Sequence, residues 1–145
     1  MRKQYKFVKH TADVEYVASG RSLEECFKNA LMAMFDTLSY VDKVSLSKSK
    51  IITLKIDDKA STLQDLLWYV LQDILSVSDS KSVFCYGTKK ITIRKTTGSY
   101  RVNATFKAKE REDKTSKLDV KGVARYNLTL KKTKDRFEAT VVLDV

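Results

Sequence analysis

Two stretches of the sequence place apolar residues at helical spacing, whereas the remaining apolar residues mostly alternate with polar ones. In the first stretch, Ser22 begins a capping-box pattern, and an apolar stripe follows to about residue 38. In the second, Ser61 and Thr62 can cap a helix whose leucine-rich stripe runs to about residue 76. The sequence therefore predicts two amphipathic helices, each burying one face.

Alternation with a period of two indicates half-buried strands in most of the rest of the chain. We expect strands at residues 52–57, 100–107, 126–130 and 137–143, and shorter ones near 5–9, 14–18 and 90–95. The segments 126–130 and 137–143 flank a polar turn at 132–135 and predict a C-terminal hairpin. This order favours an α+β fold, a two-layer sandwich with both helices on one face of a mostly antiparallel sheet. The polar stretch 108–118 predicts a mobile loop.

The size and composition are those of one globular domain spanning residues 1–145. The 145 residues are 43% hydrophobic and 32% charged, and no apolar run approaches the roughly 18 residues of a membrane span. The basic start of the chain lacks the apolar stretch of a secretory signal. Cys26 and Cys85 lie at unlinked apolar positions and are expected to be reduced core residues. We expect a cytoplasmic protein that does not enter the membrane.

Several catalytic chemistries lack the residues they need. A zinc site requires three or four convergent ligands, and the chain has one histidine and two distant cysteines. No glycine-rich phosphate-binding loop is present. A cysteine–histidine dyad stays open, but buried thiols of this kind are usually inert. These features favour a protein that is not itself an enzyme.

Two carboxylates near the ends of the sequence are candidate metal ligands. A sheet could bring Asp13 beside Asp144, and Val145 adds a main-chain carboxylate if the chain stops there. Oxygen ligands of this kind suit Ca²⁺ or Mg²⁺. The alternative is that Asp13 caps a turn and Asp144 is a solvated terminus, and the residues alone favour that alternative. His10 is most simply a structural histidine that orients the first turn.

A formal net charge of +10 and a pI near 9.6 indicate an acidic partner: nucleic acid, an acidic protein surface or a nucleotide. Basic residues gather at 89–95 and at 131–136. By default they are solvated strand edges, and only clustering on one face would make them a nucleic-acid footprint. Trp68 and Tyr69 are expected to be partly core and partly rim.

Motifs along nearly the whole chain resemble those of the archease family. The matching segments are residues 7–14 (FVKHTADV), 20–31, 63–71, 119–127 (DVKGVARYN) and 142–145 (VLDV). The opening and closing motifs together are fairly specific. The sequence departs from the family's pattern at three positions, Lys9, Gly122 and Asn127, which puts surface contacts and residues around the metal ligands in doubt.

The resemblance implies an accessory protein that activates an RtcB-type tRNA-splicing RNA ligase. It would promote GTP-dependent guanylylation of the ligase's own histidine and support multiple turnover, while the ligase performs the covalent chemistry. The partner would be that ligase, and direct contact with tRNA stays open. The alternative is a basic RNA-binding or chaperone module for tRNA-modifying enzymes.

The resemblance also assigns residues to a site. Asp13, Asp144 and Val145 would bind a divalent metal, assigned to Ca²⁺ with Mg²⁺ as the other candidate. Lys121, together with the two aspartates, would act in ligase activation. His10 and Thr11, beside Asp13 in the same motif, are candidates to support the metal ligands.

Overall fold

The structure is a computed structural model, and it describes residues 4–8 and 13–145. Its helices are α1 (Leu23–Leu38), α2 (Val41–Leu46), α3 (Leu63–Lys81) and a single 3-10 turn, η1 (Asp113–Thr115). Among the described residues, no helix combines the length and the apolar character needed to cross a membrane.

Both predicted helices are present, and their first turns are capped as expected. The Ser22 Oγ accepts a hydrogen bond from the Glu25 N–H at 3.1 Å, and the Thr62 Oγ1 accepts one from the Asp65 N–H at 3.1 Å. Helix α3 continues past its predicted end and stops at Ser82, whose φ of 53° is left-handed.

The strands form two antiparallel sheets. The first sheet has the order β1 (Tyr5–Val8), β2 (Val14–Gly20), β8 (Phe137–Asp144) and β6 (Gly122–Val123), and β7 (Thr129–Lys132) also pairs with β8. The second sheet has the order β3 (Ile52–Ala60), β5 (Ser99–Glu110) and β4 (Val83–Thr96). The predicted C-terminal hairpin is β7–β8, in which Lys132 pairs with Phe137.

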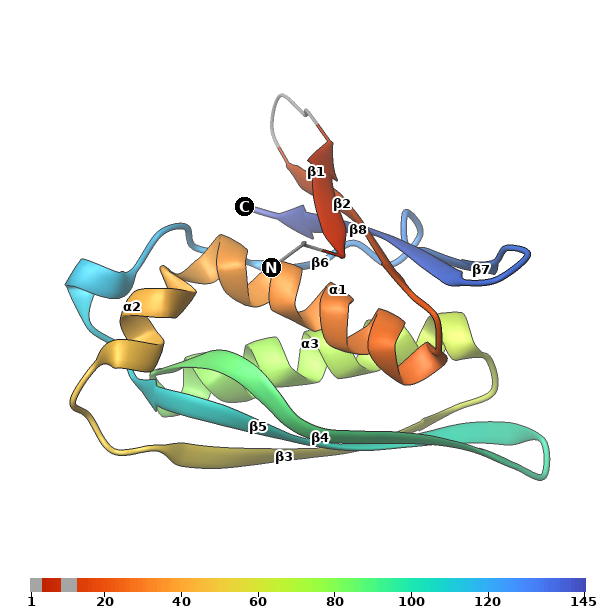
Figure 1. The fold of residues 1–145 in the computed structure, drawn as a ribbon, viewed down its shortest axis with the longest axis horizontal. Coiled ribbons are helices and arrows are strands. Elements are labelled where there is room, and N and C mark those ends of the chain that lie inside the picture. Colours follow the sequence, from red (N-terminus) through yellow and green to blue (C-terminus); the bar gives the residue numbers. More distant parts are fainter. Residues whose placement is uncertain (1–3, 9–12) are drawn as a thin grey trace.

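The two main helices lie between these sheets. Figure 1 shows β3, β4 and β5 below α1 and α3, and β2, β7 and β8 above them. Helix α1 contacts β2 and β8 of the first sheet and β4 of the second, whereas α3 contacts β3 and β5 of the second sheet and β6 and β7 of the first. The α+β class and the antiparallel pairing are thus confirmed. The expected single sheet is corrected to two, because strands flank the helices on both sides.

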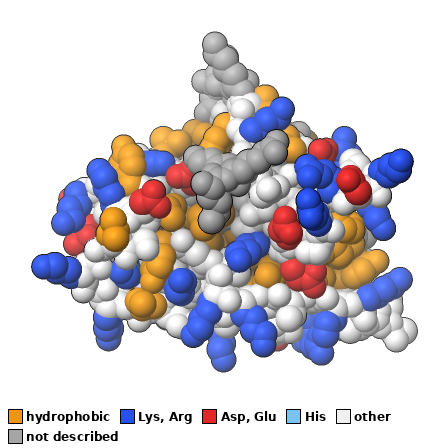
Figure 2. All heavy atoms as spheres, viewed as in Figure 1, with side chains coloured by type: hydrophobic (Ala, Val, Ile, Leu, Met, Phe, Trp, Pro, Cys, Tyr) orange, Lys and Arg blue, Asp and Glu red, His pale blue; other side chains and the backbone are white. Residues whose placement is uncertain are grey.

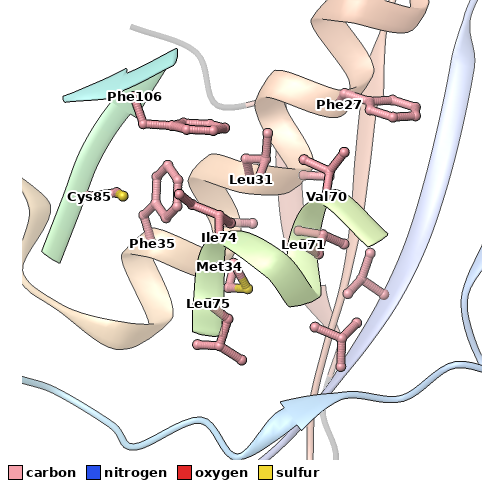
Figure 3. Packing of buried hydrophobic residues seen from close by; sticks show 14 of the residues in the cluster. Phe27, Leu31, Met34, Phe35, Val70, Leu71, Ile74, Leu75, Cys85 and Phe106 are labelled. Atoms are coloured by element: carbon pink, nitrogen blue, oxygen red, sulfur yellow. The ribbon is translucent and has the colours of Figure 1, made fainter. Parts of the chain in front are cut away.

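The core fills the space between the helices and the two sheets (Figure 3). The Phe35 and Phe106 rings meet edge to face at 5.9 Å, which joins α1 to β5. On the other side of α1, the buried Tyr16 hydroxyl donates to the Ala30 carbonyl at 2.8 Å, which satisfies its only polar group. Each fully buried leucine such as Leu71 contributes about 2 kcal/mol by leaving water.

The stretch 108–118, predicted to be a mobile loop, is instead anchored along its length. Strand β5 continues to Glu110, and the Thr115 carbonyl accepts a hydrogen bond from the Tyr40 N–H at 2.8 Å. The Lys109 side chain is only 5% exposed, and its Nζ donates to two main-chain carbonyls at the end of α2, at 2.8 and 2.7 Å. Polar composition was misleading here because main-chain hydrogen bonds and the buried Lys109 ammonium tie the stretch to the rest of the fold.

Candidate functional site

The first and last long strands of the first sheet bring Asp13 and Asp144 to the same end. Strands β2 and β8 are antiparallel, and their final pair is Val14 with Leu143. Continuing this register by one pair places Asp13 opposite Asp144. Side chains directly opposite on antiparallel strands have Cβ atoms about 4.5–5.5 Å apart. The register therefore brings Asp13 and Asp144 to the same end of the sheet.

Lys121 lies on the other side of β8 from Asp13. Its N–H donates to the Asp144 carbonyl oxygen at 2.7 Å, and the adjacent Gly122 pairs with Asp144 in the β6–β8 ladder. Asp144 is thus held against β6 through the main chain, with its own side chain exposed. Leu143 is fully buried, and Val145 packs partly against the core. Strand β8 therefore ends at Asp144 itself.

The donor set fits a hard divalent cation in type and in place. Two carboxylates repel each other when placed side by side, and a cation between them removes that repulsion. Within residues 4–8 and 13–145, no group of three or more His, Cys, Asp or Glu side chains converges on one point. Asp13 and Asp144 are candidate oxygen ligands, and the described side chains offer no nitrogen or sulfur cluster that would favour zinc.

Two residues assigned to this end by resemblance, His10 and Thr11, lie outside the described residues, as does Lys9.

An open groove of about 570 Å³ runs beside Asp13. Its apolar lining includes Phe7, Val8 and Leu118, whose side chains are 46%, 38% and 42% exposed. Exposed apolar side chains that gather beside polar ones mark a surface available to a partner. Sequence reasoning did not identify this groove, because Leu118 belonged to the stretch expected to be a loop and Phe7 to a strand expected only to pair.

The polar wall of the groove is an ion pair between Asp36 and Lys117. The Lys117 Nζ lies 3.1 Å from the Asp36 Oδ1 and also donates to the Asp36 carbonyl at 2.8 Å. The Tyr5 hydroxyl donates to the Asp36 Oδ2 at 3.2 Å. Partial burial, with the neighbouring Asp36 carboxylate, raises the pKa of Tyr5 to about 12. Tyr5 is therefore a fixed hydrogen-bond donor at neutral pH.

Both cysteines are core residues, as predicted, and neither forms a disulfide. Burial raises the pKa of the Cys26 thiol to about 12 and that of Cys85 to about 11. Thiols in this state are poor nucleophiles.

Trp68 and Tyr69 combine core and rim positions, as expected. The Trp68 indole N–H donates to the Val123 carbonyl at 2.8 Å, and the Arg125 guanidinium lies 4.5 Å from the Trp68 ring centre. Arg125 therefore covers the ring face that a base would need.

The basic residues divide between the two sheets. Those on the β7–β8 hairpin are partly engaged: Lys131 lies 3.9 Å from Glu138, and Lys132 lies over the Phe137 ring. Lys90 and Arg94, by contrast, belong to β4 in the second sheet and are exposed.

Comparison with known proteins gives a consistent result. The model of the Archease protein family (MTH1598/TM1083) matches residues 5–145. A protein archease from Methanosarcina acetivorans is 30% identical over 99% of this chain and 97% of its own length, and one from Methanosarcina barkeri is 31% identical with the same coverage.

Two solved structures share the fold. The solution structure of Methanobacterium thermoautotrophicum protein 1598 superposes with a TM-score of 0.83 at 25% identity, covering 99% of this chain and all of that one. A crystal structure from Thermotoga maritima, described as an archease and possible chaperone, has a TM-score of 0.57 at 21% identity, covering 100% of this chain and 98% of that one. At that identity, the second likeness concerns the fold alone.

Proposed function

The chain belongs to the archease family, and from that premise we propose that it activates an RtcB-type tRNA-splicing RNA ligase. It would promote GTP-dependent guanylylation of the ligase and sustain repeated turnover, without performing the covalent step itself. The observation that supports this proposal is that the segments carrying Asp13, Asp144 and Lys121 meet at one end of the first sheet: Val14 pairs with Leu143, and the Lys121 N–H donates to the Asp144 carbonyl.

Each of these residues has a distinct part in the proposal. Asp13 and Asp144, with a contribution from Val145, would hold Ca²⁺ or a similar hard cation. When bound there, the cation would supply positive charge for phosphate oxygens. Lys121 is exposed next to this point and would contact a phosphate or an acidic residue of the ligase. A rigid strand end is suited to this, because it presents the carboxylates without first having to become ordered.

The groove beside Asp13 gives the proposed contact an apolar component. Phe7, Val8 and Leu118 expose large side chains next to Asp13. Charged groups alone give an interface fast association and orientation, whereas buried apolar side chains supply most of its affinity. We propose that the ligase covers this groove when the acidic end reaches its active site.

The proposed setting is the cytoplasm, where thiols stay reduced, and both cysteines are unpaired. A role without covalent catalysis is supported by the two buried thiols, whose raised pKa values make them poor nucleophiles. The alternative, an RNA-binding or chaperone module for tRNA-modifying enzymes, needs no ligase for its activity. Stimulation that depends on the ligase therefore discriminates between the two functions.

The test is multiple-turnover RNA ligation by an RtcB-type ligase with wild-type protein, Asp13→Asn, Asp144→Asn and Lys121→Ala. Asp135→Asn is the matched control, since Asp135 is an exposed aspartate in the turn at the opposite end of β8. We expect the three site variants to lose most of the stimulation, about 10-fold or more, as for residues that orient charged ligands. The control should stimulate like wild type. Equal stimulation by all four variants would refute the proposed site.

A further inference from the structure

The outward face of the second sheet is a separate, strongly basic surface on the far side of the helices from Asp13 and Asp144. The inward positions of β3 and β5 are largely apolar and buried, so the alternate positions face outward. Six cations occupy this outward face: Lys55, Lys59, Lys90, Arg94, Arg101 and Lys107. We call it the basic sheet face. Figure 2 shows Lys and Arg side chains projecting along the lower rim, where this sheet lies.

The cations are placed side by side by the strand register. Lys59 pairs with Arg101, and Arg101 pairs with Arg94, so three cations form one row across three strands. Like charges directly opposite on neighbouring strands destabilise a sheet. Arg101 is partly compensated by Asp57, whose Oδ1 lies 3.2 Å from its Nε, and Asp57 is the sole carboxylate among the outward positions of this fully described sheet. A polyanion bound to the face would remove the remaining repulsion.

The rest of the face is polar and suits phosphate oxygens. Thr92, Asn103 and Thr105 lie between the cations and line a shallow depression of about 410 Å³ with Lys55, Lys90 and Asp57, the carboxylate that pairs with Arg101. Hydroxyl and amide groups can donate to phosphate oxygens between the charged contacts. From Arg101 to Lys107, the face extends about 20 Å along β5, given about 3.3 Å per strand residue.

We propose that the basic sheet face binds the phosphate backbone of RNA. Cations repeated over three strands match a repeating polyanion better than the few fixed carboxylates of one protein partner. From Arg101 to Thr105 the outward positions, all of them described, carry no large apolar or aromatic side chain, and Phe84 and Tyr86 at the Lys107 end are only 4% and 9% exposed, so the face lacks the exposed anchor that holds a peripheral protein in a membrane. For the same reason it lacks a platform for stacking bases, and binding is independent of sequence. Only the choice of RNA over DNA rests on the proposed function.

The test measures RNA binding without any ligase, so it is separate from the test of ligase activation. A fluorescent oligouridine of about 20 nucleotides exceeds the roughly 4–16 nucleotides that single-strand-binding surfaces cover. Its anisotropy is followed with wild type and with the triple variant Lys59→Gln, Lys90→Gln and Arg94→Gln. The control is the triple variant Lys131→Gln, Lys132→Gln and Lys134→Gln. It removes an equal number of positive charges from the β7–β8 hairpin of the other sheet.

Counterion release sets the expected sizes. With six cations engaged, log K should fall with log salt at a slope of about −4, and the face variant should reduce this slope by about 2. Its affinity at about 0.15 M salt should fall by about 10- to 100-fold, with a much smaller loss in the control. Melting temperature reports folding, and the face variant should melt at or above the wild-type temperature because like-charge repulsion is removed.

Three results would overturn the proposal. One is that wild type fails to bind the oligouridine, and another is that both triple variants weaken binding equally, which would assign the effect to net charge alone. The third is that phosphatidylserine vesicles bind more tightly than RNA and with the same dependence on the three face residues, which would make the face a membrane contact.

Discussion

Replacing Asp144 by asparagine should change stability in opposite directions with and without Ca²⁺. The β2–β8 register places Asp144 opposite Asp13, and like charges directly opposite on antiparallel strands cost about 0.2–1 kcal/mol. Without divalent cations, Asp144→Asn removes this repulsion and the side chain is exposed, so no core packing is lost. For a chain of this size, the melting temperature should stay level or rise by up to about 4 °C.

With Ca²⁺ at about 100 times its dissociation constant, the unfolding free energy of wild type should rise by about 2.7 kcal/mol. Its melting temperature should then rise by about 5–10 °C. Asp144→Asn should gain much less, so the order of the two melting temperatures reverses. Scanning calorimetry in EDTA and in Ca²⁺ measures all four values, with Asp135→Asn as the control that should follow wild type in both buffers. If Asp144→Asn melts well below wild type in EDTA, or gains as much from Ca²⁺, then Asp144 is a structural residue and the proposed cation site is wrong.

Three further predictions concern the scaffold. Burial, with the neighbouring Asp73 carboxylate, raises the pKa of Asp58 from 3.8 to about 7. Between about pH 4 and 7, the Asp58 carboxyl therefore keeps its proton in the folded state and loses it in the unfolded state. Unfolding free energy should therefore fall as pH rises from about 4 through 7 in wild type, and Asp58→Asn should flatten that fall in denaturant titrations. Gly20→Ala should destabilise the fold by about 1–3 kcal/mol in urea unfolding, because its Cβ would collide with the main chain at Cys26 at the start of α1; an unchanged midpoint would contradict this. Lys109→Met should cost about 1–3 kcal/mol in the same assay, because two main-chain carbonyls lose their charged donor; a neutral or stabilising effect would show that those carbonyls find water.

Local structure was largely predictable because its causes are local. Ser22 and Thr62 cap helices as the sequence indicates, and the apolar stripe that follows Ser22 is buried. The two-sheet arrangement was not predicted, since alternation shows that a strand is half-buried without showing which sheet it joins. In the structure, α1 is buried over a wide arc that includes Ala33 and Thr37. A helix buried over a wide arc is covered from more than one side.

From the residues alone, a site at Asp13 and Asp144 was only the less favoured of two interpretations, and the resemblance reversed that order. Asp13 and Asp144 are at opposite ends of the sequence, and nothing in their spacing indicates that β2 and β8 pair. The basic sheet face is a similar case. Lys90 and Arg94 are close in the sequence, but Lys59 and Arg101 join them only through the β3–β5–β4 register. Sites assembled by non-local pairing require the topology before their residues can be grouped.

The most direct test of the proposed function is the rate at which an RtcB-type ligase attaches GMP to its own histidine, measured with radiolabelled GTP while wild-type protein is added in substoichiometric amounts. The account predicts that such amounts raise the guanylylation rate of the whole ligase pool, that EDTA abolishes the effect, and that Asp144→Asn fails to produce it at the same concentration. A rate that is unchanged at every ratio of wild-type protein to ligase, with Ca²⁺ or Mg²⁺ present, would contradict the account.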